Sequence, residues 1–369
     1  MVDALKKLDK KFLITAGLLI FIPILIIIFL ALIQGCSNKT TSYESYEKKM
    51  LTAGEKYLKS KLPANEAEVK SVSLDTLVKE KYIKSTDKSL KDSTCKGEVT
   101  VRLNGSLVEE NKGGYYNYTV NLNCKDYNTK SLKNLLEENV VTEGAGLYKV
   151  GNSYIFKGDE VKDYLTLSGK SYRILGIDSN GIVKLLSSEA LSYSLPWDTK
   201  YNSSVNDSKG ITKYQDSSIL KYLNTMYKNE KMYKVNSKKH MIAYDVCIDS
   251  RNADDYTIKN YDECSTYATK QIISLPSVND FALASNDKEC TNLNARSCIN
   301  YNYLRYVGFN TWTLNPVATN SYEVFYVSSG FLRVTEANEE RNAFYVIYID
   351  GNEIVKTGDG SKDHPYVID

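Results

Sequence analysis

Cysteine is the residue type whose number and spacing say most about chemistry in this sequence. One of the seven cysteines, Cys36, follows a long apolar segment. The other six lie further along the chain: Cys95, Cys124, Cys247, Cys264, Cys290 and Cys298. An even set without a C-x-x-C pair is typical of disulfides in a chain that folds outside the cytoplasm. With His240 and His364 as the only histidines, we expect no metal site and no cofactor.

The first two of these six cysteines flank a predicted β-hairpin. Residues 96–103 and 115–124 alternate apolar and polar side chains around a turn that contains glycine. Cys95 and Cys124 each share the parity of the apolar residues on their own strand. Both sulfur atoms should therefore face the apolar side at the open end of the hairpin, within disulfide reach. We predict this disulfide, which would stabilise the fold by about 3 kcal/mol in the chain-entropy model.

The pairing of the other four cysteines is not determined by the sequence. Four cysteines permit three connectivities. Order along the chain favours Cys247 with Cys264 and Cys290 with Cys298.

Catalytic motifs are missing from the sequence. It has no G-x-S-x-G turn, no phosphate-binding glycine loop and no H-E-x-x-H. Ser93-Thr94-Cys95 faintly resembles the Thr-x-Thr-Cys segment of sortases, but such an enzyme would need a histidine upstream of the cysteine, and none precedes Cys95. Glycan cleavage needs two carboxyl groups about 5–10 Å apart, and one segment holds four candidates: Asp249, Asp254, Asp255 and Asp262. Charged loops explain these residues more simply, so we name no catalytic residue and regard an enzyme as the less favoured interpretation.

Two loop-like segments hold the candidates for ligand binding. Trp197 lies in L-P-W-D, whereas Trp312 and Asn315 lie in W-T-L-N-P. Indole rings in loops can stack on sugars or anchor a protein partner. Core packing is the alternative for both rings, and it is favoured for Trp312 because an apolar residue and a proline follow. Trp197, Trp312 and Asn315 are therefore the predicted ligand-binding residues.

One segment is long and apolar enough to cross a membrane. Residues 12–33 carry no charge, and as a helix they would extend roughly 33 Å against a bilayer core of about 30 Å. Lysines before this segment favour a cytoplasmic location for residues 1–11. A lipoprotein signal is the alternative, because Ile33-Gln34-Gly35-Cys36 resembles a lipidation sequence in which Cys36 is acylated. Either anchor, taken as residues 12–34, leaves the chain from residue 37 outside the cytoplasm.

Hydrophobic periodicity divides that outer part into two α+β units. A small unit at 37–130 combines an amphipathic helix over about 43–58 with the disulfide-closed hairpin. A linker at 131–146 precedes a unit of short strands at 147–369, where Asn180-Gly181 predicts a tight hairpin turn. A further helix is predicted over 217–227. The 47 basic and 45 acidic residues are mixed along the chain, so we exclude nucleic acid as a partner.

The last three fifths of the chain resemble a known domain family. Short motifs occur in the same order as in an uncharacterised family of Gram-positive envelope proteins, among them Y-I-F-K-G at 154–158, Y-R-I-L-G-I at 172–177, L-P-S-V-N-D-F at 275–281 and G-D-G-S at 358–361. That family is similar to C-type-lectin-like and formylglycine-generating-type folds. The resemblance implies that residues 147–369 form a C-type-lectin-like α+β domain at a cell surface.

Together these patterns predict a single-pass membrane protein whose outer part recognises a glycan, a cell-wall component or a protein. Two alternatives stay open. One is an envelope hydrolase that acts on glycan, and the other is a structural or sensor protein without ligand chemistry.

Overall fold

The computed structural model describes eight stretches of the chain: residues 43–65, 68–84, 95–104, 115–229, 238, 240–261, 263–307 and 309–368. The predicted anchor at 12–34 and the candidate lipidation site Cys36 lie outside these stretches. No helix within them has the length and apolar character needed to cross a bilayer.

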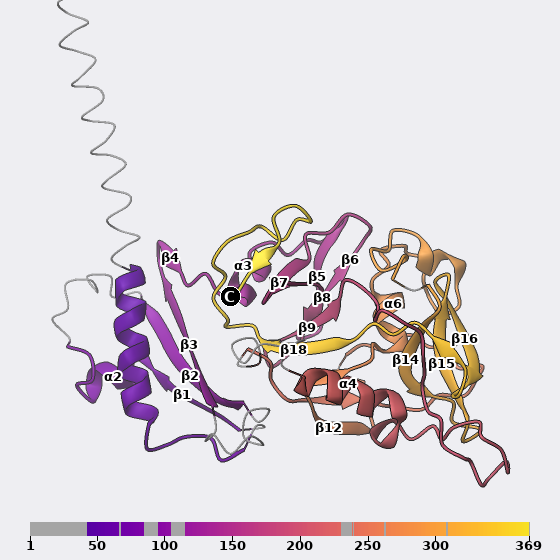
Figure 1. The fold of residues 1–369 in the computed structure, drawn as a ribbon. Coiled ribbons are helices and arrows are strands. Elements are labelled where there is room, and N and C mark those ends of the chain that lie inside the picture. Colours follow the sequence, from indigo (N-terminus) through magenta and orange to yellow (C-terminus); the bar gives the residue numbers. More distant parts are fainter. Residues whose placement is uncertain are drawn as a thin grey trace, which may run out of the picture.

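The first part of the chain forms a small α+β domain, in which one helix packs against a four-stranded antiparallel sheet (Figure 1). The helix covers residues 43–58 and buries Tyr46, Met50 and Leu58. These residues belong to the apolar stripe that predicted it. The sheet and one short helix comprise β1 (Val69–Ser73), α2 (Leu74–Lys79), β2 (Lys96–Asn104), β3 (Tyr115–Cys124) and β4 (Tyr127–Asn128).

The predicted hairpin is present as β2 and β3. Val99 lies opposite Val120, and both side chains are buried against the helix together with those of Val101 and Leu122. A disulfide joins Cys95 to Cys124 at the open end. The hairpin prediction and its disulfide are therefore confirmed.

The segment predicted as a linker is folded onto the second domain. Helix α3 (Leu132–Glu137) begins after Ser131, whose Oγ accepts a hydrogen bond from the backbone of Asn134 at 3.3 Å. The backbone N–H of Leu132 donates to the carbonyl oxygen of Glu353 at 2.9 Å. Leu132 and Leu136 are buried in the core of the second domain. Residues 131–146 thus belong structurally to that domain.

An eight-stranded sheet forms the centre of the second domain (Figure 1). Six strands follow one another in the order β13-β18-β9-β8-β6-β5, while β7 pairs with β8 and with β19. All pairings are antiparallel except that of β7 with β19. The strands are β5 (Gly146–Val150), β6 (Ser153–Lys157), β7 (Tyr164–Leu167), β8 (Lys170–Ile177), β9 (Ile182–Ser187), β13 (Ile273–Ser274), β18 (Val346–Asp350) and β19 (Tyr366–Val367).

The β8–β9 turn forms where Asn180-Gly181 predicts it. The carboxylate of Asp178 accepts hydrogen bonds from the backbone N–H of Asn180 and of Ile182, at 2.9 and 2.8 Å. Gly181 has a φ of 75°, a conformation that glycine adopts without steric cost. The tight turn places Asp178 at the end of the central sheet.

Smaller elements surround the central sheet. A three-stranded antiparallel sheet of β14, β15 and β16 lies at the end of the second domain farthest from the small domain in Figure 1. Two further pairs of strands are β10 with β17 and β11 with β12. Their bounds and those of the remaining helices are β10 (Leu195–Pro196), the 3-10 helix η4 (Tyr214–Asp216), α4 (Ser218–Lys228), β11 (Tyr244–Cys247), β12 (Tyr267–Gln271), α6 (Val278–Leu283), the 3-10 helix η5 (Arg296–Ile299), β14 (Thr311–Pro316), β15 (Glu323–Ser328), β16 (Phe331–Glu336) and β17 (Glu340–Arg341). The fold is α+β, as predicted.

The two domains meet through partly buried polar contacts. Arg102 of β2 donates from Nε to Oδ2 of Asp350 at 2.6 Å. Asn117 of β3 donates from Nδ2 to Oε1 of Glu353 at 2.7 Å, and the other carboxylate oxygen of Glu353 lies 2.8 Å from Nδ1 of His240. The outer face of the small sheet is thereby fixed to the end of β18 and to the segment that follows it.

Candidate functional site

The two tryptophans predicted to bind a ligand are core residues. Trp197 and Trp312 are each 0% exposed. The indole N–H of Trp197 donates to the carbonyl oxygen of Thr313 at 3.0 Å, and that of Trp312 donates to Leu195 at 2.7 Å. Each ring therefore fastens the β10 segment to β14 from inside the molecule. The expectation that they offer a stacking face to a ligand is not met, because packing covers both rings.

Asn315 lies beside a cleft, but its amide group is occupied. Its Nδ2 donates to the backbone carbonyl of Asp249 at 2.9 Å, and its Oδ1 accepts from the backbone N–H of Val278 at 3.0 Å. The side chain is 3% exposed. Asn315 thus positions two neighbouring segments, and it is not a free ligand-binding amide.

The cleft beside Asn315 is the candidate functional site. Its volume is about 320 Å³, and its lining comes from the β8–β9 turn, β9, β11, the segment 249–263, the start of α6, β14 and β18. Tyr244 and Tyr348, both in the lining, stack with ring centroids 4.4 Å apart and planes 18° from parallel. The cleft is therefore built from elements that lie far apart in the sequence.

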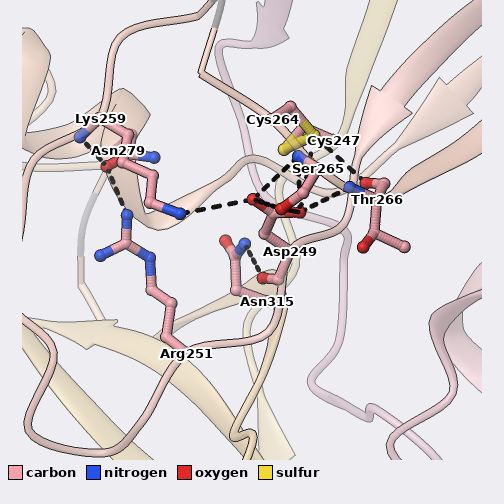
Figure 2. Close-up of a disulfide and its surroundings, with 9 residues drawn as sticks. All are labelled: Cys247, Asp249, Arg251, Lys259, Cys264, Ser265, Thr266, Asn279 and Asn315. Atoms are coloured by element: carbon pink, nitrogen blue, oxygen red, sulfur yellow. Dashed lines mark hydrogen bonds and ion pairs between the residues drawn. A yellow bond between two sulfur atoms is a disulfide. The ribbon is translucent and has the colours of Figure 1, made fainter.

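A disulfide closes the segment that contributes most to this cleft. Cys247 at the end of β11 bonds to Cys264 (Figure 2). Just beyond it, the backbone N–H of Ile248 donates to the carbonyl oxygen of Thr266 at 2.8 Å. Cys290 bonds to Cys298. Both pairings that chain order favoured are confirmed.

Asp249 is the hydrogen-bonding centre of the closed segment. Its carboxylate accepts from the backbone N–H of Thr266 at 2.7 Å, from the backbone N–H and hydroxyl of Ser265 at 3.1 Å, and from Nζ of Lys259 at 3.4 Å (Figure 2). Burial raises the pKa of Asp249, but these hydrogen bonds outweigh burial and leave it below its ordinary value. The carboxylate is ionised and positions the segment.

Arg251 and Asn279 fix the outer end of the same segment. The guanidinium of Arg251 donates to the carbonyl oxygen of Thr257 at 2.6 Å and to Oδ1 of Asn279 at 3.2 Å. The same Oδ1 accepts from the backbone N–H of Lys259 at 3.0 Å. Burial lowers the pKa of Arg251, whose nearest carboxylate, that of Asp255, lies 3.7 Å away. This wall of the cleft is held at several points.

The three described carboxylates among the four considered for glycan cleavage do not form one group in the cleft. Asp249 lines the cleft, but it is saturated with donors. Asp255 accepts from the backbone N–H of Thr257 at 3.1 Å and lies outside the lining, whereas Asp254 is exposed. Asp262 lies outside the described residues. The sulfur atoms of Cys247 and Cys264 lie within 4.8 Å of the Asp249 carboxylate, but they are bonded to each other and cannot act as thiolate ligands.

Lys184 and Tyr261 complete the floor of the cleft. Nζ of Lys184 lies 2.7 Å from the carboxylate of Asp280 and 5.1 Å from the ring centroid of Tyr261. Burial and the neighbouring Asp280 raise the pKa of Tyr261 well above its ordinary value, so its hydroxyl stays neutral. Sequence reasoning missed Tyr244 and Tyr261, which no motif surrounds, and treated Lys184 only as part of a strand. The one sequence feature that pointed to this segment was the pair of cysteines, Cys247 and Cys264, that flank it.

The arrangement offers a polar surface with tyrosine faces and no cysteine thiolate or activated nucleophile among its described residues. Tyr267 on the rim is 45% exposed. Such a lining suits reversible binding of a polar molecule. No family model, no curated protein and no solved structure matches this chain.

Proposed function

We propose that this chain is a membrane-anchored recognition protein that binds a glycan outside the cytoplasm, and that the cleft between the β8–β9 turn and the segment 249–263 is its binding site. The observation that carries the proposal is the cleft itself, with its tyrosines and fixed polar side chains. A volume of about 320 Å³ is at the lower end of the roughly 300–1,000 Å³ typical of ligand sites. It is enough for a short polar ligand.

The character of the lining favours a sugar. Tyr267 is exposed on the rim, and Tyr244 is held by stacking on Tyr348. Sugars present both C–H faces, which pack on aromatic rings, and hydroxyl groups, which need donors and acceptors. Asn260 and Asn279 lie in the same lining. Nδ2 of Asn260 is bonded to Glu263, and Oδ1 of Asn279 accepts from Arg251 and Lys259, so the amide atoms offered to a ligand are Oδ1 of Asn260 and Nδ2 of Asn279. Rings and hydrogen-bonding groups therefore occur together, as a glycan requires.

Location outside the cytoplasm is supported by the cysteines and by the apolar segment. Three disulfides are typical of a compartment that keeps thiols oxidised. Residues 12–34 supply either a membrane span or a lipoprotein signal. The resemblance of residues 147–369 to C-type-lectin-like envelope domains supports the same location, and we include that fold in the proposal.

Binding without turnover is favoured over hydrolysis. Hydrolysis of a glycosidic bond needs a carboxylic acid that holds its proton near neutral pH. Among the described carboxylates considered for cleavage, Asp249 is the one in the cleft lining, and its pKa lies below its ordinary value, so it cannot serve as that acid. The cleft is therefore better suited to recognition.

A glycan-binding screen on the full chain in nanodiscs tests the proposal, with release of reducing sugar measured for each glycan that binds. We expect saturable binding without release. Tyr267→Ala should weaken it about threefold to tenfold because a stacking face is lost. Tyr306→Ala is the matched control, since Tyr306 is 73% exposed and lies outside the cleft. Sugar release would favour the hydrolase, and absence of any glycan binding would contradict the proposal.

A further inference from the structure

The positive groups of the cleft already have carboxylate partners. Lys184 pairs with Asp280 at 2.7 Å. Lys259 lies 3.4 Å from Asp249. The guanidinium of Arg251 lies 3.7 Å from Asp255. These three cations therefore contribute little attraction for an anionic ligand.

Three other carboxylates in the lining have only neutral partners. Asp178 accepts from the hydroxyl of Tyr244 at 2.9 Å and from two backbone N–H groups of its own turn. Asp245 accepts from the backbone N–H of Lys270 at 2.9 Å, and Glu263 accepts from Nδ2 of Asn260 at 3.1 Å. Within the described part of the chain, no basic side chain forms an ion pair with these three. The cleft thus carries an excess of negative charge.

One tyrosine ring is held next to one of these carboxylates. The hydrogen bond from Tyr244 to Asp178 joins the ring of β11 to the β8–β9 turn within the lining of the cleft. Tyr348 stacks behind that ring and fixes its orientation. A positively charged group that enters the cleft can therefore contact a carboxylate and an aromatic ring at once, and both contacts favour a cation.

We propose that the cleft selects glycans that carry free amino groups, as ammonium ions, over the same glycans with acetylated amino groups. The inference rests on the proposed glycan-binding function and adds the ligand's charge to it. An ammonium group supplies the positively charged partner that Asp178, Asp245 and Glu263 lack. Acetylation removes that charge while it leaves the sugar ring and its hydroxyl groups unchanged.

Two oligosaccharides that differ only in acetylation provide the test. Binding of β-1,4-linked glucosamine tetramer and of N-acetylglucosamine tetramer is measured by calorimetry on the full chain in nanodiscs, at pH 6. We expect the amino form to bind about tenfold more tightly, from two or three weak charge contacts of roughly twofold to fivefold each. Its affinity should fall as salt rises from 0.05 to 0.5 M, because salt screens exposed charges.

Matched variants separate local charge from net charge. A triple variant that removes the three unpaired carboxylates with little change of shape should lose the preference: Asp178→Asn, Asp245→Asn and Glu263→Gln. A control with the same change of net charge should keep it. The control replaces three exposed acidic residues outside the cleft lining: Glu143→Gln, Glu189→Gln and Asp363→Asn. The double variant Asp245→Asn with Glu263→Gln alters exposed side chains alone and serves if the triple variant is unstable.

The outcomes distinguish this inference from the function on which it rests. Equal affinity for the two tetramers, a preference for the acetylated one, or a preference that survives the triple variant would each overturn it. Binding of other glycans but neither tetramer would overturn the charge inference and leave glycan recognition standing. If no glycan binds but a lysine-containing peptide does, both proposals fail.

Discussion

At the scale of single residues, Asp249 decides whether the cleft keeps its shape. Its carboxylate, near the start of the disulfide-closed segment, accepts hydrogen bonds from Lys259 near the end of that segment and from Ser265 and Thr266 just beyond it. A buried carboxylate is costly unless such donors compensate for lost water. The lowered pKa of Asp249 records that compensation. Its role is therefore to position the segment.

We expect Asp249→Asn to lower the free energy of unfolding by about 2 kcal/mol at pH 7, because an amide accepts fewer hydrogen bonds and carries no charge. A carboxyl group whose pKa is lower in the folded state stabilises the protein above its unfolded pKa. The stabilisation disappears as pH falls through the folded pKa, here below the ordinary value of 3.8.

Urea unfolding at pH 7 and at pH 2.5 measures both effects. The wild type should lose more stability between these pH values than Asp249→Asn loses. Asp254→Asn is the control, since Asp254 is exposed and lies outside the cleft lining. An equal acid dependence in wild type and Asp249→Asn would show that this carboxylate contributes nothing.

At the scale of elements, local patterns predicted local structure well. The periodicity over 217–227 predicted α4 to within one residue at each end, and Asn180-Gly181 predicted the β8–β9 turn. Parity along the strands predicted the hairpin and its disulfide. Trp197 and Trp312 are both covered by packing, as was favoured for Trp312. For Trp197, the loop-like flank did not reveal that tertiary packing would cover the ring.

The cleft was beyond prediction for a related reason. Its lining joins Asp178 and Lys184 to Tyr244, Tyr261 and Tyr348, which are separated by up to half the chain. Their meeting depends on β18 pairing with β9 and on the segment 249–263 folding back toward α6. No short-range pattern contains that information.

In the small domain, the helix at residues 43–58 approaches β2 of the sheet closely at Gly54. A Cβ atom at Gly54 would lie 2.5 Å from Cβ of Val99, closer than side chains can approach. We expect Gly54→Ala to lower the free energy of unfolding of the small domain by about 1–3 kcal/mol through overpacking. This loss would exceed the gain of about 1 kcal/mol that alanine gives within a helix.

A double-mutant cycle with Val99→Ala isolates that contact. Val99→Ala alone should destabilise by leaving a cavity. In the double variant the two changes should compensate, so that the combined loss is smaller than the sum of the single losses. Urea unfolding followed by circular dichroism measures the cycle. Additive losses would mean that the helix does not approach the sheet at this glycine.

At the scale of the whole molecule, the polar junction makes the two domains one unit. Asp350 is 2% exposed, and Arg102 is the cation that pairs with it. Glu353 receives Asn117 from the small domain and His240 from the large one. Glu353 and the neighbouring Gly351 also accept the first backbone N–H groups of α3. The segment after β18 therefore connects both domains and the segment between them.

Replacing Arg102 by methionine tests whether this junction couples the folding of the two domains. Methionine keeps much of the side-chain volume but leaves Asp350 buried without its cation, a loss of about 3 kcal/mol for a pair of this kind. Because the missing contact lies between the domains, the loss should fall on their coupling. Calorimetry should change from one unfolding transition in the wild type to two in Arg102→Met, with the small domain melting first.

Lys70→Met is the matched control on the same sheet, because Lys70 pairs with Glu68 at the surface. This variant should keep one unfolding transition. Asp350→Asn in the Arg102→Met background should restore part of the coupling, since it removes the unpaired charge. A single transition at the wild-type temperature in Arg102→Met would mean that hydrophobic contacts and α3 alone hold the domains together.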